Sequence, residues 1–195
     1  MINKRVFNCV TIGVSAGGLK ALMILFKELP VNFPVPVVVV QHEKADSDDL
    51  LAGLLNAKTE LRVKTAEEKE ELKGGFGYIC PVNYHILIEE NKTISLSVEA
   101  PVNFARPSID VLFETAAIAY GSELIGVVLT GASSDGAKGL VQIKNYGGYT
   151  IVQDPETAYS RYMPDAAIAA CGKPDKILSL EDIPARLLNL CMKGH

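Results

Sequence analysis

Three side chains of this sequence could perform chemistry together: Ser15, His42 and Asp135. Each follows an apolar, β-rich segment within a few residues. A hydroxyl, an imidazole and a carboxylate can act as nucleophile, general base and the group that orients the base. Because the carboxyl ends of parallel strands share one edge of a sheet, we expect the three to converge on one cleft. The expected chemistry is hydrolysis of an ester or amide through a covalent acyl-enzyme.

Ser15 stands in the pentapeptide Gly13-Val14-Ser15-Ala16-Gly17, which matches the pattern Gly-x-Ser-x-Gly between a strand and a helix. Small neighbours permit a tight turn that exposes the hydroxyl, and the following helix directs free N–H groups toward developing negative charge. Short glycine-rich turns are also common as phosphate-binding turns or as plain connections between a strand and a helix. The pentapeptide alone leaves these alternatives open.

His42 directly follows the apolar run 35–41, which places it at the same edge as Ser15. The unperturbed pKa of histidine, about 6.5, suits a general base near neutral pH. Capping of the next element is the alternative role. His195 is the last residue, and His85 lies in a run expected to form a hairpin, where a structural role is favoured. His85 is therefore the reserve candidate for the base.

Asp135 lies in the loop after the apolar run 124–130 and could hold the second ring nitrogen of a histidine. The alternative is an ordinary capping loop, because Ser-x-Asp-Gly often precedes a helix. The chain order Ser, His, Asp differs from the Ser, Asp, His order of the α/β-hydrolase superfamily, which disfavours membership of that superfamily.

The elements that must position these residues alternate between apolar strands and helices. Expected strands cover 5–14, 35–41, 124–130, 149–152 and 176–179, and expected helices cover 18–29, 47–55, 107–121, 137–145, 157–170 and 181–192. Ser47 is expected to cap the second helix, and Pro164 to kink or split the fifth. The pattern predicts an α/β fold with a doubly wound, mostly parallel sheet and helices on both faces.

The region from 61 to 98 differs from the rest, because it contains only short β-like runs. They cover 61–65, 76–79, 84–88 and 93–98 and are separated by glycine, proline and Asn-Lys. Short runs at close spacing indicate hairpins. We therefore expect an inserted antiparallel hairpin region attached to the parallel sheet.

Length and composition favour a single globular domain over residues 1–195. The chain is 48% hydrophobic and 22% charged, with 19 Lys and Arg against 23 Asp and Glu and a net charge of −4. Without a basic stripe for phosphate backbones, a nucleic-acid partner is disfavoured. The chain has no Trp and is 7% aromatic, which disfavours sugar or base stacking.

The four cysteines indicate a reducing compartment and no zinc site, since none lies within four residues of another. The apolar run 6–14 is too short for a signal peptide, and no stretch approaches the ~20 apolar residues that span a bilayer. We expect a cytoplasmic protein without membrane insertion.

Seven segments resemble, in order, the catalytic domain of the bacterial chemotaxis protein-glutamate methylesterases, the CheB family. They are IGVSAGGLKAL, PVVVVQH, GYICPVNYHILI, PVNFARPSIDVLFETAA, GVVLTGASSDGAKGL, GGYTIVQDPETA and MPDAAI. The resemblance implies that Ser15 is the nucleophile, that His42 is the base and that Asp135 orients it. It also implies that backbone amides near Ala16 and Ala132 receive the oxyanion.

Two further residues fall in motifs of this resemblance, Arg106 in ARPS and Met163 in MP, and are expected near the cleft. Arg106 could bind a carboxylate or amide of the substrate, or anchor its own loop by a salt bridge. Ala16 stands where chemotaxis enzymes often carry Thr, which removes a hydroxyl. Ala132 stands where many members carry Met, which could reshape the acyl pocket.

The resemblance implies hydrolysis of the γ-methyl ester of glutamate in a methylated chemoreceptor, with release of methanol and without metal or organic cofactor. The same chemistry permits glutamine deamidation. An esterase for an unrelated protein or a small-molecule ester, and a non-catalytic module that binds phosphate or an acidic peptide, remain as alternatives. The first expected strand lies close to the N-terminus, so we expect no receiver domain in this chain. The protein would then be either a stand-alone esterase or one controlled by a partner in trans.

Overall fold

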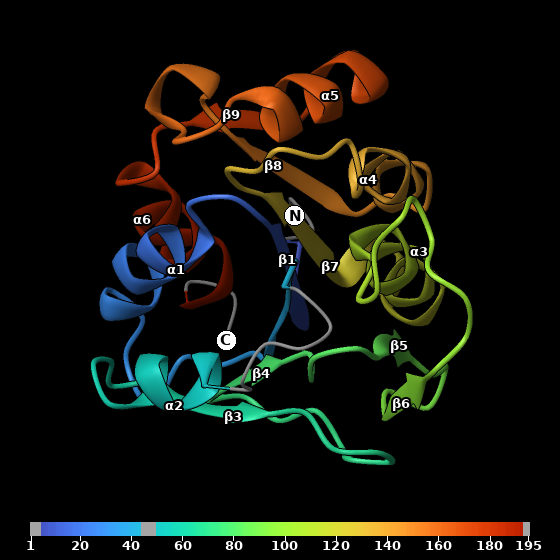
Figure 1. Cartoon of the computed structure of the whole chain (residues 1–195). Helices are drawn as coiled ribbons and strands as arrows, with labels where there is room; N and C mark the ends of the chain where they lie inside the picture. Colours follow the sequence, from blue (N-terminus) through green and yellow to red (C-terminus); the bar gives the residue numbers. More distant parts are fainter. Residues whose placement is uncertain (1–4, 44–49, 193–195) are drawn as a thin grey trace.

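The computed structural model describes residues 5–43 and 50–192, and its centre is a seven-stranded parallel sheet (Figure 1). The strand order is β3-β4-β2-β1-β7-β8-β9. The strands are β1 (Cys9–Val14), β2 (Val37–Gln41), β3 (Arg62–Thr65), β4 (Phe76–Ile79), β7 (Leu124–Val128), β8 (Tyr149–Gln153) and β9 (Lys176–Leu178). Every neighbouring pair is parallel. The expected α/β class is confirmed.

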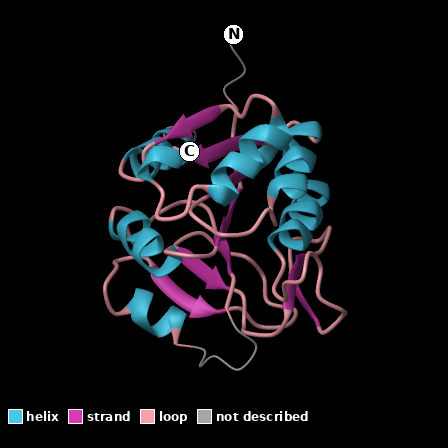
Figure 2. Ribbon diagram, turned by 45° about the horizontal axis from the view of Figure 1, so that its top comes forward, coloured by secondary structure: helices cyan, strands magenta, loops and turns pink. Residues whose placement is uncertain are grey.

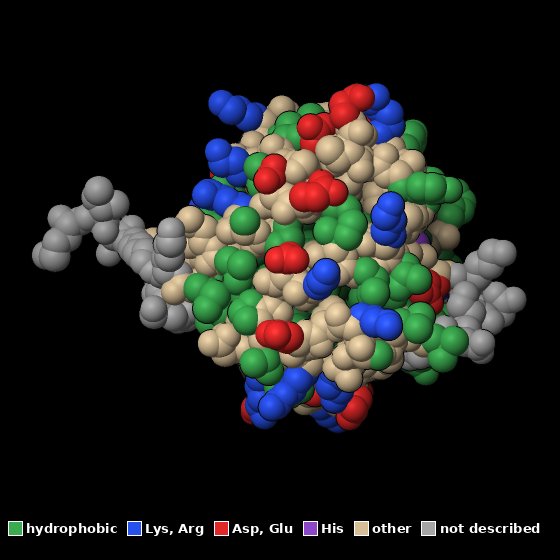
Figure 3. Space-filling view, turned by 90° about the vertical axis from the view of Figure 1, so that its left-hand side faces the viewer, with side chains coloured by type: hydrophobic (Ala, Val, Ile, Leu, Met, Phe, Trp, Pro, Cys, Tyr) green, Lys and Arg blue, Asp and Glu red, His purple; other side chains and the backbone are tan. Residues whose placement is uncertain are grey.

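Helices cover both faces of this sheet, as Figure 2 shows. One face carries α1 (Gly18–Lys27), α2 (Leu51–Asn56) and α6 (Asp182–Met192). The other carries α3 (Ile109–Tyr120), α4 (Ala137–Asn145) and α5 (Tyr162–Cys171). On the side of the molecule that includes α1 and α6, acidic, basic and apolar side chains are interspersed (Figure 3).

The central strands are buried on both faces because their apolar residues alternate between two cores. Val37 and Val39 pack in the core beneath α1, whereas Val38 and Val40 pack in the core beneath α3. All four are inaccessible to solvent. A nearly continuous β-branched run is the sequence expected of a strand with helices on both sides.

The region from 61 to 98 departs from expectation at its first two strands. β3 and β4 are parallel members of the main sheet, and the prediction of hairpins there is wrong. Only β5 (His85–Ile88) and β6 (Ile94–Ser97) pair antiparallel, in a separate two-stranded sheet that packs against α3. The connection 66–75 returns the chain from the carboxyl end of β3 to the amino end of β4, as a parallel pair requires.

Pro164 lies in the first turn of α5, where no N–H needs an intrahelical partner. The segment expected as one helix over 157–170 is instead a short 3-10 turn, η2 (Pro155–Thr157), followed by α5. The expected cap Ser47 lies outside the described residues. Within the described ranges no helix has both the length and the apolar character needed to cross a membrane.

Candidate active site

The loops that follow β1, β2 and β7 meet at the carboxyl edge of the sheet. β1 lies between β2 and β7, and the chain winds outward from it in both directions, so this is the topological switch point where open α/β sheets bind ligands. The register pairs Val14 with Gln41, which makes Ser15 and His42 the next residues on adjacent strands. The Ser15 N–H donates to the Thr130 carbonyl at 3.0 Å, which ties β1 to β7 at the same level.

The turn that carries Ser15 is held by one side chain from β2 and one from the loop that follows β7. Gln41 Nε2 donates to the carbonyls of Ser15 at 3.0 Å and His42 at 2.9 Å, and Thr130 Oγ1 donates to the carbonyl of Ala16 at 2.9 Å. Gly17 has φ 80°, a left-handed conformation that glycine adopts without strain, and α1 starts at the next residue. The Ser15 hydroxyl is half-buried and bonds to no other described residue, which leaves it available to a substrate.

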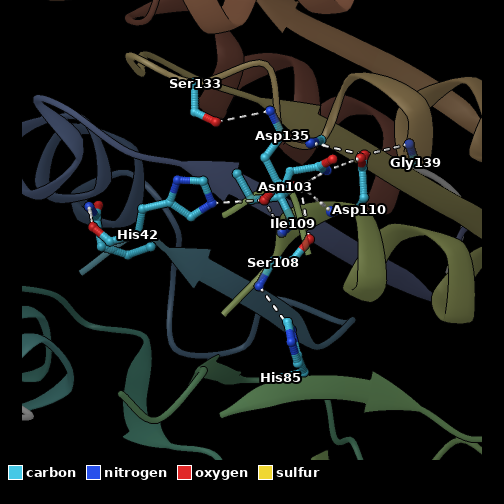
Figure 4. A network of polar contacts seen from close by, with 11 residues as sticks. His42, His85, Asn103, Ser108, Ile109, Asp110, Ser133, Asp135 and Gly139 are labelled. Carbon is cyan, nitrogen blue, oxygen red and sulfur yellow. Dashed lines mark hydrogen bonds and ion pairs between the residues drawn. The ribbon is translucent and has the colours of Figure 1, made fainter. Parts of the chain in front are cut away.

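Asp135 is fully buried and accepts hydrogen bonds at both carboxylate oxygens (Figure 4). Oδ2 accepts from His42 Nε2 at 2.8 Å and from the Ile109 N–H at 2.6 Å. Oδ1 accepts from Asn103 Nδ2 at 2.9 Å and from the Ser108 hydroxyl at 2.8 Å. Burial by itself raises the pKa of Asp135, but the bonds from His42, Asn103, Ile109 and Ser108 outweigh it and hold the pKa below its ordinary value.

The ionised Asp135 determines which ring nitrogen of His42 carries the proton. A carboxylate can only accept, so Nε2 of His42 must donate, and Nδ1 is the nitrogen left with a lone pair. His42 directly follows β2 and lies next to the Ser15 turn, so this nitrogen is the one left to act as a base. The imidazole, the carboxylate and the turn that carries Ser15 therefore lie at one edge of the sheet.

A second buried carboxylate, Asp110, supports the first. Its Oδ1 accepts the N–H groups of Gly136 at 2.9 Å and Gly139 at 2.7 Å, at the start of α4. Its Oδ2 accepts from Asn103 Nδ2 at 2.8 Å, so one amide group bridges Asp110 and Asp135. Burial raises the pKa of Asp110, and the neighbouring charge of Asp135 adds to the increase.

The backbone N–H groups of Ala16 and Ala132 donate to no acceptor within the described residues, although both flank the Ser15 site. Met163 is buried and packs on Gly131. A Cβ atom on Gly131 would lie 2.7 Å from the Met163 sulfur and 2.9 Å from the Ser15 Cβ, so the two side chains share this glycine surface. The structure therefore places Ala16, Ala132 and Met163 around Ser15.

Within the described residues, Arg106 donates its hydrogen bonds to its own loop and to the connection between β4 and β5. Its Nε and Nη2 donate to Asn83 Oδ1 at 3.0 and 2.7 Å, and its Nη1 donates to the carbonyls of Val98 and Glu99 at 2.6 and 2.9 Å. Of the two roles expected for Arg106, this geometry is that of a loop anchor, although its partners are uncharged and form no salt bridge.

His85 is also structural in its contacts. It is buried in β5, its Nδ1 accepts the Ser108 N–H at 3.2 Å, and its Nε2 lies 3.2 Å from the Ala100 carbonyl. Residue types alone had marked neither Ser108 nor Asn103 as part of the site. Ser108 precedes α3, where it would ordinarily cap the helix, but its hydroxyl bonds to Asp135 instead. Within the described segments no three His, Cys, Asp or Glu side chains are grouped to hold a metal ion.

A parallel α/β sheet with this arrangement at its switch point is the architecture of a hydrolytic enzyme. A family model described as CheB methylesterase matches residues 10–187. The chain belongs to the CheB methylesterase family, as its motifs had indicated.

Individual relatives agree with this assignment. A Leptospira interrogans protein (strain Fiocruz L1-130) is 50% identical over 184 residues, with 94% of this chain and 95% of the relative covered. The Thermotoga maritima protein-glutamate methylesterase/protein-glutamine glutaminase is 40% identical, and the match covers 53% of its length. The crystal structure of the Thermotoga maritima CheB methylesterase catalytic domain superposes with a TM-score of 0.89 at 39% identity, covering 94% of this chain and 98% of that one.

The names of these relatives agree with hydrolysis of glutamate methyl esters and with glutamine deamidation. The Leptospira protein is also named for the protein-glutamate methylesterase/protein-glutamine glutaminase activity. An Archaeoglobus fulgidus protein of the same name is 40% identical over 167 residues. The family's chemistry, fold and hydrolase class thus all correspond to what the motifs of this chain predict.

Proposed function

We propose that this protein is a cytoplasmic serine hydrolase that removes methyl groups from glutamate γ-methyl esters in methylated chemoreceptor-like proteins. The observation that supports it most directly is the 2.8 Å bond between His42 Nε2 and Asp135, made beside the turn that carries Ser15. Glutamine side chains react by the same route, with ammonia in place of methanol. A partner in trans would supply regulation.

In the first half-reaction, the Ser15 hydroxyl attacks the γ-carbonyl carbon while Nδ1 of His42 takes its proton. Asp135 keeps the imidazole in the required tautomer and stabilises the imidazolium. The free N–H groups of Ala16 and Ala132 donate to the oxyanion, and the loss of one such donor typically lowers turnover by roughly 10²–10³-fold. Methanol leaves with the proton held by His42.

In the second half-reaction, water attacks the acyl-enzyme. His42 takes a proton from the water and returns it to the Ser15 oxygen as the acyl bond breaks. The products are the free serine and a glutamate carboxylic acid, which releases its proton to solvent at neutral pH. Every step uses side chains of this chain and leaves them as they began.

Two measurements test the proposal in sequence. A fluorophosphonate probe should label Ser15 in the native protein and fail to label the Ser15→Ala variant. Methanol release from methylated receptor membranes should then be seen with the native protein only. Labelling without methanol release would favour an esterase for another ester. Substrate binding that survives Ser15→Ala, with no labelling of the native protein, would favour a binding module.

A further inference from the structure

The segment Val102–Ala105, here called the rim turn, presents one aromatic side chain entirely to solvent. Val102 and Ala105 exchange both backbone hydrogen bonds, at 3.0 and 2.9 Å, and enclose two residues with positive φ, Asn103 at 52° and Phe104 at 62°. Positive φ at both central positions defines a type I′ turn, for which Asn-Gly is the favoured sequence. A bulky side chain at the second position is strained.

Phe104 differs from every other phenylalanine of the chain. It is fully exposed, whereas four of the others are buried and Phe76 is partly buried. An exposed ring on a strained residue contributes nothing to the stability of the isolated fold. The ring is therefore available for contact with a ligand.

The rim turn is attached to the site itself. Asn103, the residue before Phe104, donates to Asp135 at 2.9 Å and to Asp110 at 2.8 Å. Asn103 therefore points inward to the carboxylate that holds His42, while its neighbour points outward. The backbone of Phe104 is therefore held next to the residue that bonds to Asp135.

A second exposed aromatic side chain lies next to the Ser15 turn. The Cβ atom of Tyr159 packs against the Ser15 turn, because a Cβ atom on Gly17 would lie only 2.6 Å from it. The Tyr159 side chain is nevertheless 83% exposed. Phe104 precedes α3 on one face, and Gly17 precedes α1 on the other. Tyr159 therefore lies beside the Ser15 turn, and Phe104 follows the residue that bonds to Asp135.

We propose that Phe104 is a specificity-determining residue that binds apolar side chains next to the esterified glutamate of a polypeptide. This inference rests on the proposed function and names what lies around its substrate group. Only three carbon–carbon bonds separate the γ-carbonyl carbon of glutamate from its Cα. When that carbonyl reaches Ser15, the polypeptide backbone must lie on the rim, where its neighbouring side chains meet Phe104. A small ester would make no such contact.

The test compares two synthetic peptides with a central glutamate γ-methyl ester, flanked by leucines in one and by serines in the other. Fluorescence anisotropy measures their binding to Ser15→Ala, which leaves the ester intact. We expect the leucine peptide to bind roughly 10-fold more tightly, the effect of burying one large apolar contact. Phe104→Gly in the same background should abolish the preference. It installs the favoured Asn-Gly turn, so its unfolding midpoint in urea should equal or exceed that of the parent.

Ile118→Ser is the matched control, since Ile118 is an exposed apolar residue on α3 at 54% accessibility, and it should keep the preference. In the otherwise native enzyme, Phe104→Gly should lower kcat/KM for the leucine peptide about 10-fold relative to p-nitrophenyl acetate, mainly through KM. A preference that survives Phe104→Gly, or is absent from the parent, overturns the inference. Methanol release without leucine preference would leave the proposed function standing alone. Preferential binding through Phe104 without methanol release would support the role of Phe104 in peptide binding and contradict the proposed function.

Discussion

At the scale of single residues, the site depends on a carboxylate that hydrogen bonds at both oxygens hold in one orientation. Asp135 accepts from His42 and Ile109 at one oxygen and from Asn103 and Ser108 at the other. Asp135→Asn would place an amide NH₂ against one set of these donors and would remove the charge that stabilises the imidazolium. We expect ester hydrolysis to fall on the order of 10⁴-fold.

The measurement is kcat/KM for a glutamyl methyl ester peptide, with fluorophosphonate labelling of Ser15 as a second readout. Asp165→Asn is the control, because Asp165 is an exposed carboxylate on α5 that pairs with Arg161. That variant should retain native activity. If Asp135→Asn kept a tenth of the native rate, the role proposed for the carboxylate would be wrong.

The lowered pKa of Asp135 also predicts how stability depends on pH. The folded state binds the Asp135 proton less readily than the unfolded chain does, so the carboxylate stabilises the fold at neutral pH. This contribution is fully present above the ordinary pKa of about 3.9 and is lost as the pH falls through the lowered folded value.

Urea unfolding of the native protein and of Asp135→Asn, measured between pH 7 and pH 3, checks the sign. The difference in unfolding free energy should be constant near neutrality and shrink on acidification. Asp110, whose pKa is raised by burial, is present in both proteins, and the comparison removes most of its effect. A difference that grows as the pH falls would contradict the hydrogen-bonded, ionised Asp135.

The residues that could be predicted from the sequence are those whose types and positions mark them independently of the fold. Ser15, His42 and Asp135 each follow a strand, and their residue types suggest the chemistry. Asn103 gave no such signal, because its amide acts only through two carboxylates from other segments. Arg106 gave a signal with two meanings, and only its contacts with Asn83 and two carbonyls distinguish them.

At the scale of elements, α3 is positioned by its close approach to β1. A Cβ atom on Gly13 would lie 2.2 Å from Ile109 Cγ2, so the first turn of α3 rests directly on this glycine. The Ile109 N–H is also a donor to Asp135. Gly13→Ala should push α3 outward, cost about 1–3 kcal/mol of stability and lower activity together with it.

Urea unfolding and ester hydrolysis of Gly13→Ala measure the two effects. Gly53→Ala is the control, since a Cβ atom there meets nothing within 4 Å on the exposed side of α2. It should stabilise the protein by roughly 0.5–1 kcal/mol and leave activity unchanged. Native activity in Gly13→Ala would show that the approach of α3 does not set the position of Asp135.

The elements themselves were predictable in type and order, because each β-branched run and each amphipathic segment had a distinct period. Their partners were not always predictable. β3 and β4 are runs of four residues, too short to show whether one or both faces are buried, and their spacing suggested a hairpin. Their parallel pairing depends on β2, which offers β4 a partner across the main sheet.

At the scale of the whole molecule, the site exists only when the sheet is assembled. The three strands β2, β1 and β7 lie side by side in the sheet, and His42, Ser15 and Asp135 follow them in that order. One layer of helices packs on each face of these strands. No local segment contains more than one of the three residues. The reactivity of Ser15 is therefore expected to be a property of the global fold.

This expectation can be measured by following the rate of fluorophosphonate labelling of Ser15 and the far-ultraviolet circular dichroism through the same urea titration. The two transitions should coincide, because loss of the sheet separates hydroxyl, base and carboxylate in one step. Gly53→Ala should move both midpoints upward together. Labelling that is lost at lower urea, while the dichroism stays native, would mean that the loops at the carboxyl edge open separately from the sheet. In that case the contacts of Gln41 and Thr130 with the Ser15 turn would be too weak to couple the site to the fold.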